Sequence, residues 1–176
     1  MKKFSLTLFL FTLIGMVAFA QNSKKDQKII DDSAEAKAEF IEADPEMASL
    51  FSSSHGYIIL PNVGKGGLGV GAASGNGVAY EGGAMIGFAS MKQLSIGFQA
   101  GGQAYREVVF FENEEAFTRF KTGQIEMSAQ VSAVAATAGV SADAEYVDGV
   151  MVFTIAKGGL MYEASVGGQQ FKFRAK

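Results

Sequence analysis

Apolar residues recur at two different spacings along this chain, and the change comes near residue 55. Between residues 24 and 53 they recur every three or four positions, which predicts helix. Asp44-Pro45 interrupts this run. Because aspartate suits an N-cap and proline suits the first helical position, we expect a second short helix to start there.

The polar side of this predicted helix allows two interpretations. It is acidic, with residues such as Asp31, Glu35 and Glu39. A helix that lies on an anionic membrane surface normally carries lysine and arginine on its polar side. We therefore expect this helix to pack its apolar side against a sheet, in preference to binding a membrane.

After Gly56 the apolar residues alternate with polar or small ones. This period of two recurs in residues 94–101, 124–135 and 170–174. Such alternation predicts half-buried strands of an antiparallel sheet.

One further helix is expected between two of these strands. Asn113 suits its N-cap, Glu114 and Glu115 its first turn, and Gly123 its stop. Arg119 and Lys121 would fall in the last turn, where positive charge is favourable. We expect a helix over about 113–122 that packs on the sheet.

Glycine is concentrated in the first half of the predicted sheet. Fourteen of the 22 glycines lie between Gly56 and Gly102. Gly75-Asn76-Gly77 and Gly82-Gly83 are typical of hairpin turns or bulges, which let a sheet turn corners. The sequence therefore predicts an α+β protein whose antiparallel, glycine-rich sheet is strongly bent or closed into a small barrel, with the helices packed against it.

The first 20 residues have the features of a secretory signal peptide. Lys2-Lys3 precede an apolar run, and Ala18-Phe19-Ala20 matches a cleavage site. We expect an exported protein, either periplasmic or secreted, with a peripheral position on a membrane as one alternative. Its predicted organisation is a signal peptide over 1–20, a helical segment over 21–55 and a glycine-rich β domain over 56–176.

Composition and motifs exclude several classes of chemistry. The chain has no cysteine, and loss of Lys2 and Lys3 would take its net charge from −3 to −5, which argues against a nucleic-acid binder. The Gly64-x-Gly66-x-x-Gly69 pattern would bind a dinucleotide only at the start of a helix, and the residues that follow cannot sustain one. The only histidine, His55, is expected at the end of the second helix. We expect no catalytic residues, no metal and no cofactor.

The basic residues are the better candidates for a site. Lys65 and Lys157 occupy matching places in two Lys-Gly-Gly-Leu sequences, and Lys172 and Arg174 project from one side of the last predicted strand. Such residues suit a phosphate or an anionic headgroup. A solvated strand face is the alternative interpretation.

Several long motifs in order make the chain resemble the SYLF-domain family. They are GYIILPNVGKGGLGVGAASGNG, SIGFQAGGQAYREVVFFENEEAFTRFKTG, Tyr146-Val147-Asp148-Gly149 and KGGLMYEASVGGQQFKF, so the resemblance runs from about Asp31 to Phe173. It implies a lipid-binding module without enzymatic activity, since eukaryotic members bind phosphoinositide-bearing membranes and some bind actin. With a signal peptide and no SH3 or FYVE domain in this sequence, an actin role is not expected. The resemblance and the basic pattern together give the candidate headgroup contacts Lys65, Lys92, Lys157, Lys172 and Arg174.

The expected function is the binding of anionic lipid or another amphiphile at the cell envelope. One alternative is a structural or assembly module that binds a protein partner or a second copy. A less favoured alternative is a hydrolase built on carboxylates, which would require Glu81, Glu107 and Glu163 to lie in one cleft.

Overall fold

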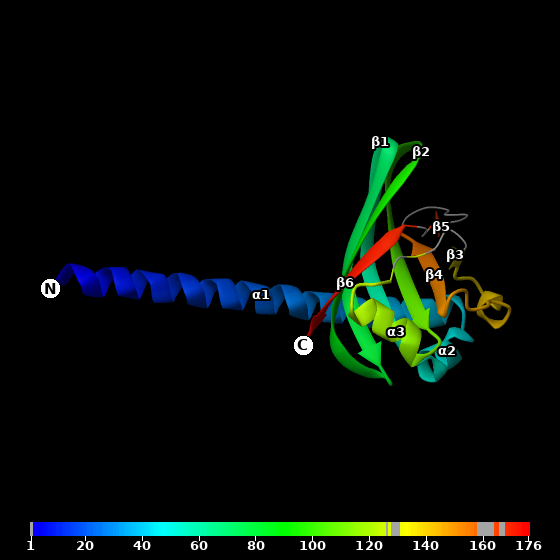
Figure 1. Ribbon diagram of the computed structural model, residues 1–176, viewed down its shortest axis with the longest axis horizontal. Helices are drawn as coiled ribbons and strands as arrows, with labels where there is room; N and C mark the ends of the chain where they lie inside the picture. The colour runs from blue at the N-terminus through cyan, green and yellow to red at the C-terminus, as the bar shows by residue number, and fades with distance from the viewer. Residues whose placement is uncertain (1, 126, 128–130, 158–163, 166–167) are drawn as a thin grey trace.

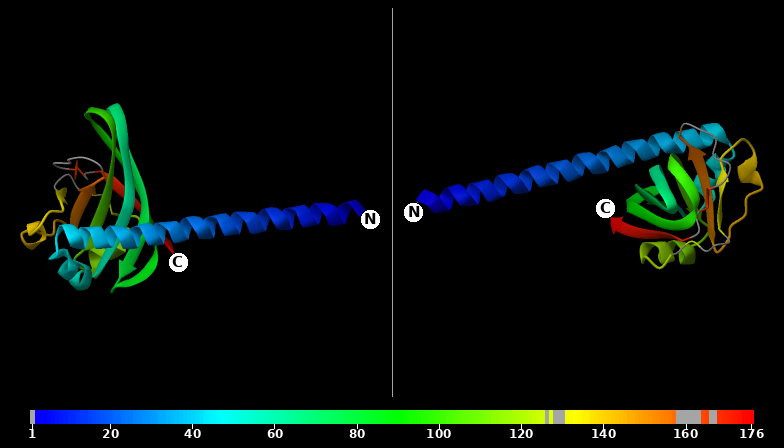
Figure 2. Two further views of the ribbon diagram at one scale, coloured as in Figure 1. Left: turned by 180° about the vertical axis from the view of Figure 1, so that it is seen from behind. Right: turned by 90° about the horizontal axis from the view of Figure 1, so that it is seen from above.

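The computed structural model describes residues 2–125, 127, 131–157, 164–165 and 168–176. One curled sheet occupies the centre, with α1 along one side of it and α3 on another (Figures 1 and 2). The elements follow in the order α1 (Lys2–Ala43), α2 (Met47–Ser53), β1 (Gly56–Glu81), β2 (Ala84–Phe111), α3 (Glu114–Lys121), β3 (Ser132–Ala135), a 3-10 turn (Val140–Ala142), β4 (Val150–Ala156), β5 (Ala164–Ser165) and β6 (Gln169–Ala175).

Both N-terminal helices form as the periodicity predicts. α1 extends well beyond the sheet at its N-terminal end, where the predicted signal peptide lies (Figure 1). Within the described residues, no helix combines the length and the apolar character that crossing a bilayer requires.

The break between these helices differs from the prediction in one respect. α2 begins at Met47 with Glu46 as its N-cap, so Asp44 is not the cap. Asp44 is fully buried instead, where its carboxylate accepts hydrogen bonds from the backbone N–H groups of Glu46, Gly139 and Ser141. Burial by itself raises the pKa of Asp44, but the hydrogen bonds from Ser141 and its neighbours outweigh burial and hold the pKa below its ordinary value. Asp44 therefore fixes the α1–α2 junction to the loop before β4.

The acidic side of α1 also differs from the prediction, because part of it faces the sheet. Arg106 of β2 is buried, and its guanidinium pairs with both Glu35 and Glu39 of the helix. Its Nη1 also donates to the carbonyl oxygen of Pro61 at 3.1 Å. The helix is thus held by charge as well as by apolar packing, because a buried guanidinium needs anionic and carbonyl partners.

The centre of the fold is a long two-stranded ribbon that bends back on itself. β1 and β2 pair in antiparallel register from Gly56↔Phe111 to Glu81↔Ala84, with irregularities in register after Leu60, Leu68 and Ala79. The two strands rise together and turn down again, as Figure 1 shows. The Gly64–Gly69 pattern continues as strand, so the helix that a dinucleotide site requires is absent there.

Glycines serve two different purposes in this ribbon. Gly82 and Gly83 have positive φ angles and form the hairpin turn, as predicted. Gly75-Asn76-Gly77 is neither turn nor bulge, which corrects the prediction, because it lies inside regular β1 pairing. A Cβ on Gly77 would overlap the carbonyl oxygen of Ile59, and one on Gly75 would lie 2.9 Å from Val63 Cγ2. Glycine is required here because the two halves of one strand pack backbone against backbone.

The remaining strands extend the ribbon on two sides. β4 pairs with the second half of β2, and β3 and β5 follow it, whereas β6 pairs with the first half of β2. The pairs are antiparallel except β3 with β4, so the sheet is mixed, and it is bent without closing into a barrel. Of the strand predicted over 124–135, only Ser132–Ala135 is a strand. The prediction is wrong at 124, 125, 127 and 131, and positions 126 and 128–130 lie outside the described residues.

Alternate residues of the central strands pack into two cores. The inner core lies inside the bend and includes Ile58, Leu60 and Val109, together with Phe117 and Phe120 of α3. α3 is capped as predicted: the Asn113 side chain accepts a hydrogen bond from Ala116 N at 3.0 Å, and Gly123 has a positive φ. The outer core lies under α1 and α2 and contains Ala36, Phe40, Met47, Phe51, Tyr57, Ile59, Val108, Phe110 and Phe153.

The close approach inside the ribbon generates a stability prediction. We expect Gly77→Ala to lower the free energy of unfolding by about 1–3 kcal/mol, because its methyl group forces the two halves of β1 apart. Gly64→Ala is the matched control, since a Cβ there meets no atom within 4 Å. Urea denaturation of both variants measures the difference, and equal stability would show that the ribbon can relax around the methyl group.

Candidate functional site

Most of the candidate basic residues gather on one side of the sheet. Their strands pair so that Asn76, Ser90 and Lys172 form one row and Ser74, Lys92 and Gln170 form the next. By the alternation of a strand, Arg174 lies on the same side as Lys172 and Gln170, while Phe171 is buried in the inner core. We call this surface the β6 face: Ser74, Asn76, Ser90, Lys92, Gln170, Lys172 and Arg174.

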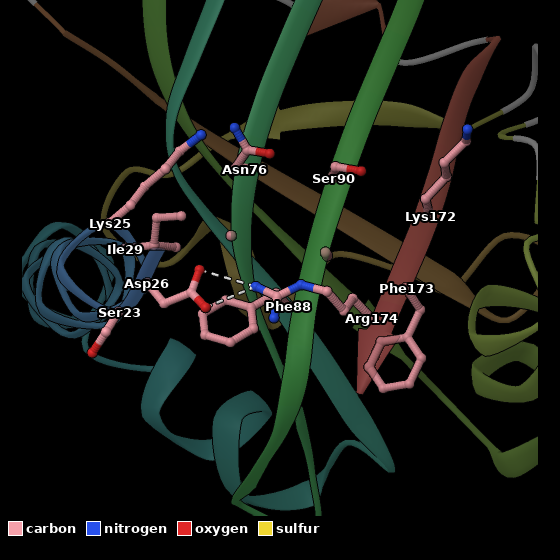
Figure 3. Close-up of a pocket in the computed structure, with 12 residues that line it drawn as sticks. Ser23, Lys25, Asp26, Ile29, Asn76, Phe88, Ser90, Lys172, Phe173 and Arg174 are labelled. Atoms are coloured by element: carbon pink, nitrogen blue, oxygen red, sulfur yellow. Dashed lines mark hydrogen bonds and ion pairs between the residues drawn. The ribbon is translucent and has the colours of Figure 1, made fainter. Parts of the chain in front are cut away.

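A cleft of about 650 Å³ lies between the β6 face and α1. Lys25 and Lys172 approach it from opposite sides, and Asn76 and Ser90 lie between them (Figure 3). Lysines combined with amide and hydroxyl groups are suited to bind an anion that also carries hydroxyl groups.

One carboxylate already occupies part of this cleft. Both oxygens of Asp26 accept hydrogen bonds from Nη2 of Arg174, at 2.9 and 3.0 Å. The Arg174 guanidinium also lies over the ring of Phe88, 4.4 Å from its centroid. Figure 3 shows this ion pair crossing from the helix to the strand. Arg174 is therefore engaged by the protein itself, whereas Lys25, Lys92 and Lys172 form no ion pair with any residue that the structure describes.

Two smaller grooves continue the β6 face away from α1. One, of about 400 Å³, is lined by Lys92, Lys172 and Gln170. The other, of about 490 Å³, shares Lys92 and Gln170 and reaches Leu94. Acidic side chains line neither groove among the described residues, so both favour an anionic ligand.

The remaining two candidates, Lys65 and Lys157, do not join this face. They flank β2 on either side, since Lys65 pairs with Gln103 and the backbone N–H of Lys157 donates to the carbonyl oxygen of Ala104. Neighbouring residues of a strand point to opposite faces, so the two lysines do too. The Lys157 ammonium donates to Asn62, and burial together with the neighbouring Arg106 lowers its pKa. Asn62 in turn donates to Asp32 of α1 at 3.1 Å, so Lys157 is linked to the helix through Asn62.

The three carboxylates considered for a hydrolase are not brought together where the structure describes them. Glu81 pairs with Lys121 at 3.0 Å and contacts His55 Nε2 at 3.3 Å beside the hairpin turn. His55 follows the end of α2, as predicted. Glu107 lies in the protein interior and shares no partner with Glu81. Glu163 lies outside the described residues.

Comparison with known proteins finds similarity in the second half of the chain. Residues 92–176 match the family model Ysc84, described as "Las17-binding protein actin regulator". Over these residues the match agrees with the resemblance to the SYLF-domain family that the sequence predicts. The chain is also 30% identical over 83 residues to Beta cell expansion factor A of Aeromonas veronii. Those residues are 46% of this chain and 32% of the relative, so the chain spans about a third of that protein.

The family match covers only part of the β6 face and of the cleft beside it. It starts at Lys92, within β2, and includes β6 with Lys172 and Arg174. Lys25, Asp26 and Asn76, which line the same cleft, precede the match. The complete cleft thus needs α1 and β1 as well as the matched residues.

The matched residues also contain a buried carboxyl group, whose burial the sequence did not predict. Glu107 is fully buried, and its Oε2 accepts a hydrogen bond from Gln169 Nε2 at 2.9 Å. Its other oxygen has no hydrogen-bond partner among the described residues. Burial raises the pKa of Glu107 to about 7, although the bond from Gln169 opposes the rise.

This burial generates a pH prediction. Between the ordinary pKa of 4.5 and about 7 the folded protein holds a proton on Glu107 that the unfolded chain has lost. The free energy of unfolding therefore falls as pH rises through this window and levels off above it. Glu107→Gln is neutral at every pH, so we expect it to remove this fall of roughly 3 kcal/mol.

Urea denaturation at several values between pH 5 and 8 checks the prediction. The exposed Glu42→Gln is the control and should keep the wild-type slope. Glu39 and Glu81 have lowered pKa values, so their contributions to the free energy of unfolding change only below this pH window. They therefore do not affect the slope measured between pH 5 and 8. An unchanged slope in Glu107→Gln would show that another group is responsible.

Proposed function

We propose that the β6 face binds the anionic headgroup of a lipid or another amphiphile at the cell envelope, after export and removal of residues 1–20. The observation that carries this proposal is the gathering of Lys25, Lys92 and Lys172 around clefts that also offer hydroxyl and amide groups. Each lysine near an anionic membrane contributes on the order of 1 kcal/mol. The description of the matched family, a binding protein, supports a binding function.

The ion pair between Asp26 and Arg174 supports the same ligand chemistry. A guanidinium that donates to a carboxylate in this cleft is also suited to a phosphate, because both anions offer two oxygens to its N–H groups. We propose that Asp26 competes with the ligand for Arg174. A structural module that binds a protein partner remains the alternative function.

The lysines give the first test. We expect Lys172→Glu to weaken sedimentation with anionic vesicles about tenfold or more, because it reverses a charge at the centre of the face. Lys65→Glu is the matched control: it makes the same change in net charge on a half-exposed residue outside the face. The readout is the ratio of binding to anionic over neutral vesicles, which cancels any contribution of the apolar N-terminal segment. Equal effects of both variants would show that net charge matters and the face does not.

The aspartate gives the second test. We expect Asp26→Asn to strengthen binding to anionic vesicles several-fold, since it frees Arg174 and removes a negative charge from the cleft. Asp31→Asn, an exposed position on the same helix, is the control for the change in charge. The same sedimentation assay, at low and high salt, measures both. Weaker binding by Asp26→Asn would instead mean that the ion pair holds the face in its binding shape.

A further inference from the structure

Leu94 is the most exposed large apolar side chain among the residues whose side chains the structure describes. It is 77% exposed, and Val147, at 36%, is the other such residue. The sequence pattern grouped Leu94 with the apolar positions of a half-buried strand. The structure turns it outward because Gln93, its neighbour on β2, points inward and is buried.

The surroundings of Leu94 are amphipathic. It lies two residues from Lys92 on one side of β2, and both line the groove of about 490 Å³. The small residues Ala72, Ala73 and Gly168 also line that groove, together with the polar residues Ser74, Gln93 and Gln170. On the other side of Lys92, the neighbouring groove contains Lys172. An apolar end and a cationic end thus adjoin on one surface.

This combination fits a bilayer better than a protein partner. Lysine is depleted at protein interfaces, where its ammonium would have to leave water. At a membrane surface the same ammonium stays near the phosphates while its carbon chain follows the apolar region. No acidic residue that the structure describes lines either groove, so the charge is complementary to an anionic lipid surface.

We propose that Leu94 enters the hydrocarbon layer of an anionic bilayer while Lys92 and Lys172 contact the headgroups beside it. This inference rests on the proposed function and adds to it the orientation of the protein: the end of the β6 face near Gly168 points to the membrane. Transfer of a leucine side chain out of water is expected to change binding about tenfold or more.

Tryptophan fluorescence tests this orientation directly. The chain contains no tryptophan, so Leu94→Trp places a single reporter at the proposed depth. We expect its emission to shift to shorter wavelength with anionic vesicles, and to be quenched by lipids brominated on their acyl chains. Both variants are made in the full-length protein. Val147→Trp is the matched control, because Val147 precedes β4 and lines none of these grooves.

A second variant measures the energetic contribution. We expect Leu94→Gln to bind anionic vesicles about tenfold more weakly than the wild type, with a salt dependence like that of the wild type, because the lysines are retained. Val147→Gln should bind as the wild type does.

The possible outcomes separate this inference from the proposed function. If the protein binds anionic vesicles but Leu94→Trp shows neither shift nor quenching, the inference is wrong and headgroup binding stands. If no variant binds vesicles, both are wrong. An emission shift of Leu94→Trp that appears without lipid and grows with protein concentration would assign Leu94 to contact between copies of the chain, and would also overturn the inference.

Discussion

The fold depends on one close contact, the packing of the β1–β2 ribbon against itself. Gly75 and Gly77 let the second half of β1 lie on the backbone of residues 59–63, where no side chain fits. This contact bends the sheet, and the bend encloses the inner core that α3 covers. The bend also leaves the first half of β2 free to pair with β6, so the β6 face is a consequence of the bend.

Charge has different roles on the two sides of this sheet. Under α1, Arg106 pairs with two glutamates of the helix, and Lys157 donates to Asn62, which itself bonds to Asp32 of the helix. On the β6 face, Lys92 and Lys172 have no such partners among the described residues and stay exposed. The same residue types thus stabilise the fold on one side and are available to a ligand on the other. Buried cations need partners, whereas exposed ones are solvated by water.

Local signals made much of this structure predictable from the sequence. The Asn113 cap, the helix after it, the Gly82-Gly83 turn and the alternation in β6 all depend on neighbours in the chain. The errors concern contacts between distant residues. Sequence could not show that Asp44 would bind Ser141, that Gly77 would meet Ile59, or that Lys92 and Lys172 would be neighbours. It suggested Lys65 and Lys157 as a pair because their local sequences match, but strand alternation places them on opposite faces.

The order of the strands has a consequence for the stage of folding at which the β6 face can form. β6 follows every other strand in the chain, yet it supplies the middle of the β6 face. Its Arg174 bonds to Asp26, which lies 148 positions earlier in the chain. Contacts between such distant residues form late, because a long loop must close before they are made. A chain that is still being synthesised can therefore already contain the β1–β2 ribbon while it lacks β6, and with it Lys172 and Arg174. The β6 face is therefore complete only after β6 has been synthesised and has paired with β2.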